Sequence, residues 1–158
     1  MIAGASTVAA ARRFLARAAF VALAALAFAP VGTRAQYAQD FGPYRVRYSA
    51  IPTDRLLPEM ARAYGIERSP RRSLVNIAVE RVADGKSDLV HAAVEGTATP
   101  LTGERVVLKF REINESGTVS YIADFAIGTP DTYRFNIKLA PDGASTSYRL
   151  EFSQDFAD

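Results

Sequence analysis

Apolar and polar residues alternate along most of the chain after residue 35, with a period of two. In one segment Tyr44, Val46 and Tyr48 share one face, while the arginines between them take the other. Because successive side chains of a β-strand point to opposite faces of the sheet, this alternation predicts strands with one buried face. About seven strands are predicted in this way, at 44–50, 74–82, 90–99, 105–111, 119–127, 133–139 and 147–156.

Glycine and proline divide these segments at short intervals. Examples are Asp84-Gly85, Ser116-Gly117 and Asp142-Gly143, which are dipeptides typical of tight turns. Many short strands with frequent turns favour an all-β fold, an immunoglobulin-like antiparallel β-sandwich. A small closed barrel has the same periodicity and remains an alternative. For the sandwich we expect a set of large apolar side chains to meet in one core: Val75, Phe110, Phe125, Phe135 and Phe152.

One segment, 58–64, departs from the alternation and predicts a short helix between the first two strands. Pro58 suits the first helical position, where its missing N–H costs nothing, and Glu59 lies near the positive end of the helix dipole. Gly65 can adopt the left-handed conformation that ends a helix, and Ile66 would then fold back on the last turn.

The first 35 residues have the layout of a cleavable signal peptide. Three arginines, the last of them Arg17, precede an uncharged apolar run at 18–29, which small and polar residues follow. This run is much shorter than the roughly 20 residues that a membrane-spanning helix needs, so a permanent anchor is disfavoured. We therefore expect cleavage after Ala35 and a single periplasmic domain at 36–158, without a membrane span.

Removal of residues 1–35 changes the charge of the protein. Four of the 19 basic residues lie in that segment, so the mature part has 15 basic and 17 acidic residues and a net charge of −2. The pI of about 9.0 for the whole chain therefore gives no support to binding of nucleic acid or of an anionic membrane. The chain has no cysteine, which excludes disulfides, thiolate catalysis and lipid attachment through cysteine.

No recognisable catalytic or cofactor motif stands out. His91 is the only histidine, and in the alternating pattern it belongs to the solvent side of a strand. Without cysteine, one histidine is too few for a typical zinc site. Glu95, Glu104, Glu112 and Asp124 are interpreted as ordinary surface acids. We therefore predict a non-enzymatic protein without a metal or other cofactor.

The one local anomaly in composition is a basic cluster between Arg45 and Arg72. It contains seven arginines and three acids, whereas the rest of the mature part is net acidic. Arginines beside an aromatic residue are common in protein interfaces and anion sites, although a solvated surface paired with Glu67 and neighbouring acids explains them with less assumption. The candidate binding residues at the helix and after it are Arg62, Tyr64, Arg68, Arg71, Arg72 and Asn76.

Several stretches of the sequence, taken together and in order, resemble those of a bacterial exported family, domain of unknown function 4426. The matching stretches are Phe41-Gly42-x-Tyr44-x-Val46-x-Tyr48-Ser49-Ala50, Pro58-Glu59-Met60-Ala61-Arg62-Ala63-Tyr64-Gly65-Ile66-x-Arg68-Ser69, Leu74-x-Asn76-Ile77, Val94-Glu95-Gly96-Thr97-Ala98-Thr99, Phe110-Arg111-Glu112-Ile113, Tyr121-Ile122-Ala123, Arg134-Phe135 and Phe152-x-Gln154-x-Phe156. The resemblance implies a periplasmic immunoglobulin-like sandwich and implies no reaction or ligand.

Three functions are compatible with these observations. The leading hypothesis is a module that binds another envelope protein or a peptide through the helix, the loop after it and a free sheet edge. The second is binding or hydrolysis of a small ligand in a cleft beside the helix, with Tyr64, Arg72 and Asn76 as polar contacts. The third is a structural component of the envelope.

Overall fold

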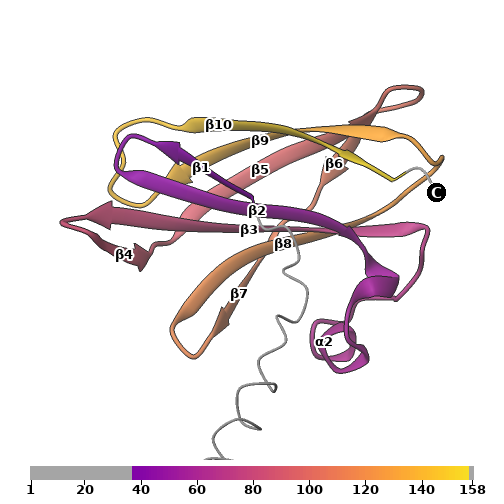
Figure 1. Cartoon of the computed structure of the whole chain (residues 1–158), viewed down its shortest axis with the longest axis horizontal. Coiled ribbons are helices and arrows are strands. Elements are labelled where there is room, and N and C mark those ends of the chain that lie inside the picture. The colour runs from indigo at the N-terminus through magenta and orange to yellow at the C-terminus, as the bar shows by residue number, and fades with distance from the viewer. Residues whose placement is uncertain (1–36, 157–158) are drawn as a thin grey trace, which may run out of the picture. The chain divides into compact units, whose positions relative to one another are not determined.

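Two antiparallel sheets form the domain, which a computed structural model describes over residues 37–156 (Figure 1). The six-stranded sheet has the order β1-β2-β3-β8-β7, with β4 also paired to β3, and the four-stranded sheet has the order β10-β9-β5-β6. The strands of the first sheet are β1 (Tyr37–Phe41), β2 (Tyr44–Pro52), β3 (Arg72–Ala83), β4 (Lys86–Leu89), β7 (Arg111–Glu115) and β8 (Thr118–Ala126). Those of the second are β5 (Ala92–Pro100), β6 (Val106–Leu108), β9 (Thr132–Pro141) and β10 (Tyr148–Asp155). The all-β sandwich prediction is confirmed, and the separate edges of the two sheets exclude a closed barrel.

The core lies between the two sheets, where the inward positions of the alternating segments meet. Val75 on β3 and Phe135 on β9 are fully buried, and Phe125 is 5% exposed. Phe135 and Phe152 stack with ring centroids 4.6 Å apart. Phe110 and Phe152 are partly buried and pack against the same cluster. All five residues expected in the core therefore meet there.

The strand count is where the structure differs from the sequence-based expectation. Ten strands are present among residues 37–156, because all seven expected segments form strands, one of them is divided, and two short strands are additional. The expected strand 105–111 ends at Leu108 in the four-stranded sheet, and β7 begins at Arg111 in the other sheet. The chain thus changes sheets at residues 109–110, which period-two alternation cannot reveal.

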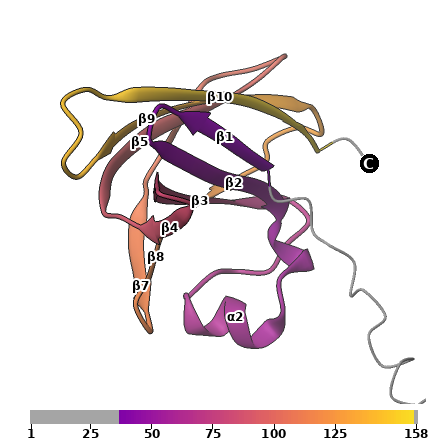
Figure 2. The ribbon, with the colours of Figure 1, turned by 60° about the vertical axis from the view of Figure 1, so that its left-hand side comes forward.

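Helix α2 (Pro58–Ala63) follows a short 3-10 turn, η1 (Thr53–Arg55), and lies between β2 and β3, the first two strands that the pattern predicted. Gly65 has φ of 63°, and the Ile66 N–H donates a 2.8 Å hydrogen bond to the Ala61 carbonyl, as expected for a left-handed helix end. The helix packs on the outer face of the six-stranded sheet, away from β9 and β10 (Figure 2). A second apolar cluster joins them: Leu56, Ala61, Ile66, Leu74 and Ile122.

The predicted signal peptide at 1–35 lies outside the described residues, so its cleavage stays a prediction. Within residues 37–156, no helix is long and apolar enough to cross a membrane.

Candidate functional site

The six candidate binding residues lie on the helix side of the six-stranded sheet or at its rim. Arg62 belongs to α2 and Tyr64 caps it, whereas Arg68 and Arg71 belong to the loop that follows. Arg72 and Asn76 are on β3, paired with Ala126 and Ile122 of β8. The sequence grouped these residues along the chain, and the structure gives them different environments.

Three of the six are engaged in contacts within the domain. The Tyr64 hydroxyl donates a 2.8 Å hydrogen bond to Glu115. Arg68 donates a 2.6 Å hydrogen bond to the Asp54 carbonyl. Arg72 forms an ion pair with Asp124 on the neighbouring strand. The first contact joins the helix end to β7, the second joins the loop to η1, and the third joins β3 to β8, so the first role of all three is structural.

Arg62 and Arg71 differ, because neither guanidinium has a hydrogen bond or ion pair within the part of the chain that the structure describes. Arg71 lines a small cavity of about 250 Å³ together with Ile127 and Phe156. Arg62 is exposed on α2, close in sequence to two exposed apolar side chains, Leu57 at 50% and Met60 at 39%. We call Leu57, Met60 and Arg62 the helix surface.

The space between α2 and the sheet is filled by side chains. Leu56, Ala61 and Ile66 are each at most 6% exposed and pack against Leu74 and Ile122 of the sheet. A packed cluster occupies the place where the small-ligand hypothesis needs a cleft. Two buried polar atoms near it, Arg72 Nε and Asn76 Oδ1, have no hydrogen-bond partner among the described residues.

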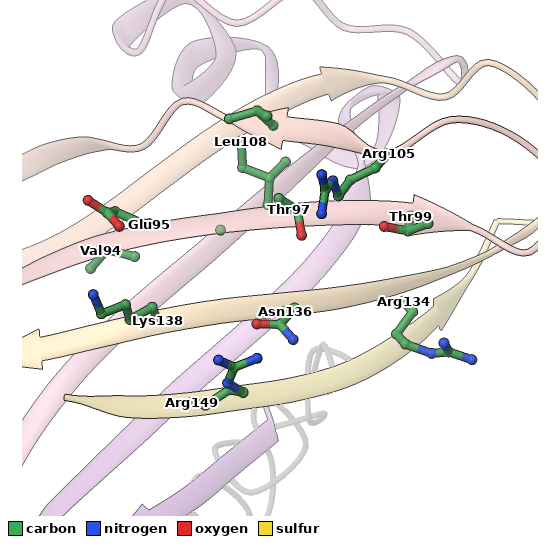
Figure 3. A pocket seen from close by; sticks show the side chains of 12 residues that line it. Val94, Glu95, Thr97, Thr99, Arg105, Leu108, Arg134, Asn136, Lys138 and Arg149 are labelled. Atoms are coloured by element: carbon green, nitrogen blue, oxygen red, sulfur yellow. The ribbon is translucent and has the colours of Figure 1, made fainter.

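A larger concavity than the one at Arg71 lies on the outer face of the four-stranded sheet, and the sequence pattern did not predict it. It is an open trough of about 670 Å³ over β5. Four cationic residues line it, Arg105, Arg134, Lys138 and Arg149, together with one acid, Glu95. Figure 3 shows the side chains of Arg105 and Arg149 reaching toward the middle of the trough from opposite sides.

Strand register brings these cations together. Arg134 pairs with Thr99, and Lys138 pairs with both Glu95 and Arg149, so these side chains share one face of the sheet. A signal was available in the sequence, since Arg134, Lys138 and Arg149 occupy outward positions of their strands and Arg105 comes one residue before β6. The order and pairing of the strands were needed to show that the four residues line one trough.

A smaller polar cluster links the two sheets at one end of the domain. His91 Nδ1 lies 3.1 Å from Glu112 Oε2, and the Tyr121 hydroxyl donates to the same oxygen at 3.1 Å. The Ala92 N–H in turn donates to the Tyr121 hydroxyl at 2.8 Å. Hydrogen bonding to His91 holds the pKa of Glu112 below its usual value. The expected exposure of His91 is confirmed. Its side-chain partner is Glu112.

Comparison with protein families gives a match over residues 38–158 to the model described as domain of unknown function DUF4426. The chain belongs to the DUF4426 family. The resemblance found in the sequence is therefore confirmed. No curated protein matches the chain.

Solved structures support the same assignment for this DUF4426 domain. A DUF4426 family protein from Pseudomonas aeruginosa PAO1 is 31% identical, with a TM-score of 0.65, over 78% of this chain and 96% of that chain. FetP from uropathogenic Escherichia coli strain F11, recombinantly expressed in the periplasm of E. coli, is 10% identical with a TM-score of 0.57, over 80% and 98% of the two chains. The second likeness shows a shared fold only.

A copper-bound variant of FetP is also similar, at 10% identity, a TM-score of 0.55 and coverage of 77% and 94%. In the DUF4426 domain, residues 37–156 contain no group of three or more His, Cys, Asp or Glu that could hold a metal ion. The family match indicates no enzymatic family. Within the same residues, Arg62 of the helix surface and the four cations of the trough form no ion pair with another residue.

Proposed function

We propose that the protein is an exported, non-enzymatic module of the cell envelope that binds another envelope protein through the helix surface. The observation that carries this proposal is the exposure of Leu57 and Met60 beside the unengaged Arg62. Isolated exposed apolar residues are common on protein surfaces. Here two of them are three positions apart on or next to a helix of six residues.

The composition of this surface suits a protein partner. Methionine and arginine are enriched in protein interfaces, and unbranched methionine adapts to the shape of a partner. Met60 and Arg62 are held in place because Ala61 between them is buried against the sheet. The Tyr64 hydrogen bond to Glu115 fixes the end of the helix. A partner would therefore meet a surface that is already ordered, which lowers the entropy cost of binding.

The charge of this region indicates the kind of partner. Between Arg45 and Arg72 the chain has seven arginines and three acids. Two of the arginines, Arg62 and Arg71, have no partner of their own within residues 37–156. A surface with acidic side chains around an apolar centre would complement this region, and charge complementarity would raise the association rate at low salt.

Export to the periplasm is part of the proposal. The family match begins at residue 38, so the segment with the arginines and the apolar run precedes the shared domain. FetP, which shares the fold, has been produced in the periplasm. Expression of the full chain followed by mass spectrometry of the periplasmic fraction tests this part. We expect a mature form beginning at Gln36, and retention of residues 1–35 would contradict it.

Site-specific cross-linking tests the binding surface. A photo-reactive residue placed at position 60 should capture a defined partner in the periplasm of the source cell. Arg62→Glu should abolish the cross-link, whereas Lys138→Glu in the four-stranded sheet should leave it intact. Circular dichroism and thermal unfolding confirm that each variant is folded. Equal capture by wild type and Arg62→Glu would contradict the use of this surface.

A further inference from the structure

We propose that the trough on the outer face of the four-stranded sheet binds an anionic glycan, a ligand with carboxylate or phosphate groups on a hydroxyl-rich chain. This site is separate from the helix surface, because α2 packs on the other sheet (Figure 2). The proposal therefore stands independently of the protein-binding function. The volume of the trough, about 670 Å³, falls within the usual range for ligand sites, roughly 300 to 1,000 Å³.

The four cationic side chains of the trough form no ion pairs within the described part of the domain. Arg105, Arg134, Lys138 and Arg149 are exposed, and none of them has an ion pair or side-chain hydrogen bond to another residue in the range 37–156. Against them stands Glu95 alone among the lining residues, so the local charge is +3. Residues 36–158 as a whole have 15 basic and 17 acidic residues, so the trough is a local concentration of positive charge.

The cations lie at two ends of the trough. Arg134 and Lys138 are four residues apart on β9, which separates their Cα atoms by about 13 Å in a strand. Arg149 pairs with Lys138, so these two lie at one end. At the other end Arg134 pairs with Thr99. Arg105 also lies there, because it precedes Val106, which pairs with Ala98. An elongated ligand with at least two anionic groups would engage both ends at once.

The lining residues in the middle of the trough are polar and uncharged, and the Glu151 carboxylate lies beside them on β10. Thr97 and Asn136 face each other there, and Thr99 is nearby (Figure 3). The Asn136 amide donates to Glu151 at 2.8 Å, which leaves its carbonyl oxygen available. Hydroxyl and amide groups between two cationic ends suit a ligand with hydroxyls between two charges. Sugars with acidic groups have this chemistry.

A polypeptide or a lipid surface fits the trough less well. No aromatic side chain lines it, and aromatic residues are enriched among the hot spots of protein interfaces. Val107 is the one highly exposed apolar residue in the lining, at 69%. Glu104 lies in the β5–β6 connection, and Asp131 lies beside it, since its carboxylate accepts hydrogen bonds from the Thr102 N–H and hydroxyl. Negative charge there opposes contact with an anionic membrane.

Calorimetric titration of the mature domain at low salt tests the proposal. The probes are trigalacturonate, a sugar trimer with three carboxylates, and maltotriose, a neutral trimer of similar size. We expect trigalacturonate to bind and maltotriose not to bind. Arg105→Gln and Arg134→Gln should each weaken binding by about tenfold, because each removes charge-assisted hydrogen bonds. Lys86→Gln on β4 of the other sheet is the matched control and should have no effect.

Three results would overturn the proposal. The first is the absence of trigalacturonate binding at millimolar concentration. The second is tighter binding of hexaglutamate or of anionic phosphatidylglycerol vesicles, which would assign the trough to an acidic polypeptide or a membrane. The third is loss of trigalacturonate binding in Met60→Asp, which would place the ligand on the helix surface. Chemical-shift changes confined to β5, β9, β10 and the segment from Arg105 to Leu108 would support the assigned location.

Discussion

The Tyr64 hydroxyl at the end of α2 donates a 2.8 Å hydrogen bond to Glu115 Oε2 at the end of β7. Arg111, at the start of the same strand, donates to the Tyr64 carbonyl. Strand β7 therefore holds the helix cap at two points, although 47 or more residues separate the partners in sequence. The orientation of the helix surface depends on this edge strand.

The hydrogen bond to Glu115 raises the pKa of Tyr64 above its usual value of 10.0. We predict that Glu115→Gln lowers this pKa, because the amide cannot stabilise the protonated phenol as strongly as a carboxylate does. NMR titration of the Tyr64 ring measures the change, and Tyr37, which has no contact with Glu115, serves as reference. The contribution to stability is present below pH 10 and is lost as the pH rises through the raised pKa. An unchanged Tyr64 pKa in the variant would contradict the prediction.

Thr53 is fully buried and organises the loop after α2. Its hydroxyl donates to the Glu67 carbonyl at 2.7 Å and accepts from the Ser69 N–H at 3.0 Å. We predict that Thr53→Val, which preserves the shape, lowers the free energy of unfolding by about 1 to 3 kcal/mol, because buried backbone groups lose their partner. Urea denaturation measures this. Thr53→Ser keeps the hydroxyl and should lose less. Wild-type stability in Thr53→Val together with a loss in Thr53→Ser would show that the methyl group matters and the hydrogen bonds do not.

Much of the fold could be predicted from the sequence, because its information is local. The alternation that includes Val75 and Phe135 indicated the buried faces, and both residues are fully buried in the core. Gly65 indicated the end of the helix, since few other residues adopt a φ of 63° readily. Asp84 and Gly85 both have positive φ, as the predicted turn requires.

The remaining features depend on pairing between distant segments. Val106 and Leu108 face inward in the four-stranded sheet, and Ile113 then packs with the helix cluster on the other sheet. A single alternating run cannot show that the chain changes sheets between them. The trough was missed for the same reason, because Arg105 and Arg149 line one face together only through the order β10-β9-β5-β6.

The contact between His91 and Glu112 leads to a prediction on pH. Hydrogen bonding to His91 lowers the pKa of Glu112 from 4.5, and the carboxylate also accepts from Tyr121. We predict that His91→Ala raises the Glu112 pKa toward 4.5. A lowered pKa in the folded state stabilises the fold above the unfolded value, and this contribution is lost as the pH falls through the folded value. Carbon-detected NMR titration of Glu112 measures the pKa. The distant Glu59 provides a control, and an unaltered Glu112 pKa would show that the His91 contact does not affect it.

Gly96 lies on β5 beneath the trough and permits a close approach to β9. A Cβ at this position would lie 3.0 Å from the Asn136 carbonyl oxygen and 3.0 Å from Ile137 Cγ1. Neither group can move easily, since Ile137 is fully buried and Asn136 belongs to the central strand β9. We predict that Gly96→Ala lowers the free energy of unfolding by about 1 to 3 kcal/mol through overpacking.

Urea denaturation of Gly96→Ala, compared with Thr97→Ala on the outward face of the same strand, checks this prediction. Thr97→Ala should change the stability by no more than about 0.5 kcal/mol, because its side chain faces the open trough. The Gly96 substitution pushes on Asn136 and so displaces the middle of the trough relative to its cationic ends. Trigalacturonate binding should therefore weaken in Gly96→Ala even under conditions where the domain is fully folded. Wild-type stability in Gly96→Ala would show that β5 and β9 can separate, and the close approach would then have no role in shaping the trough.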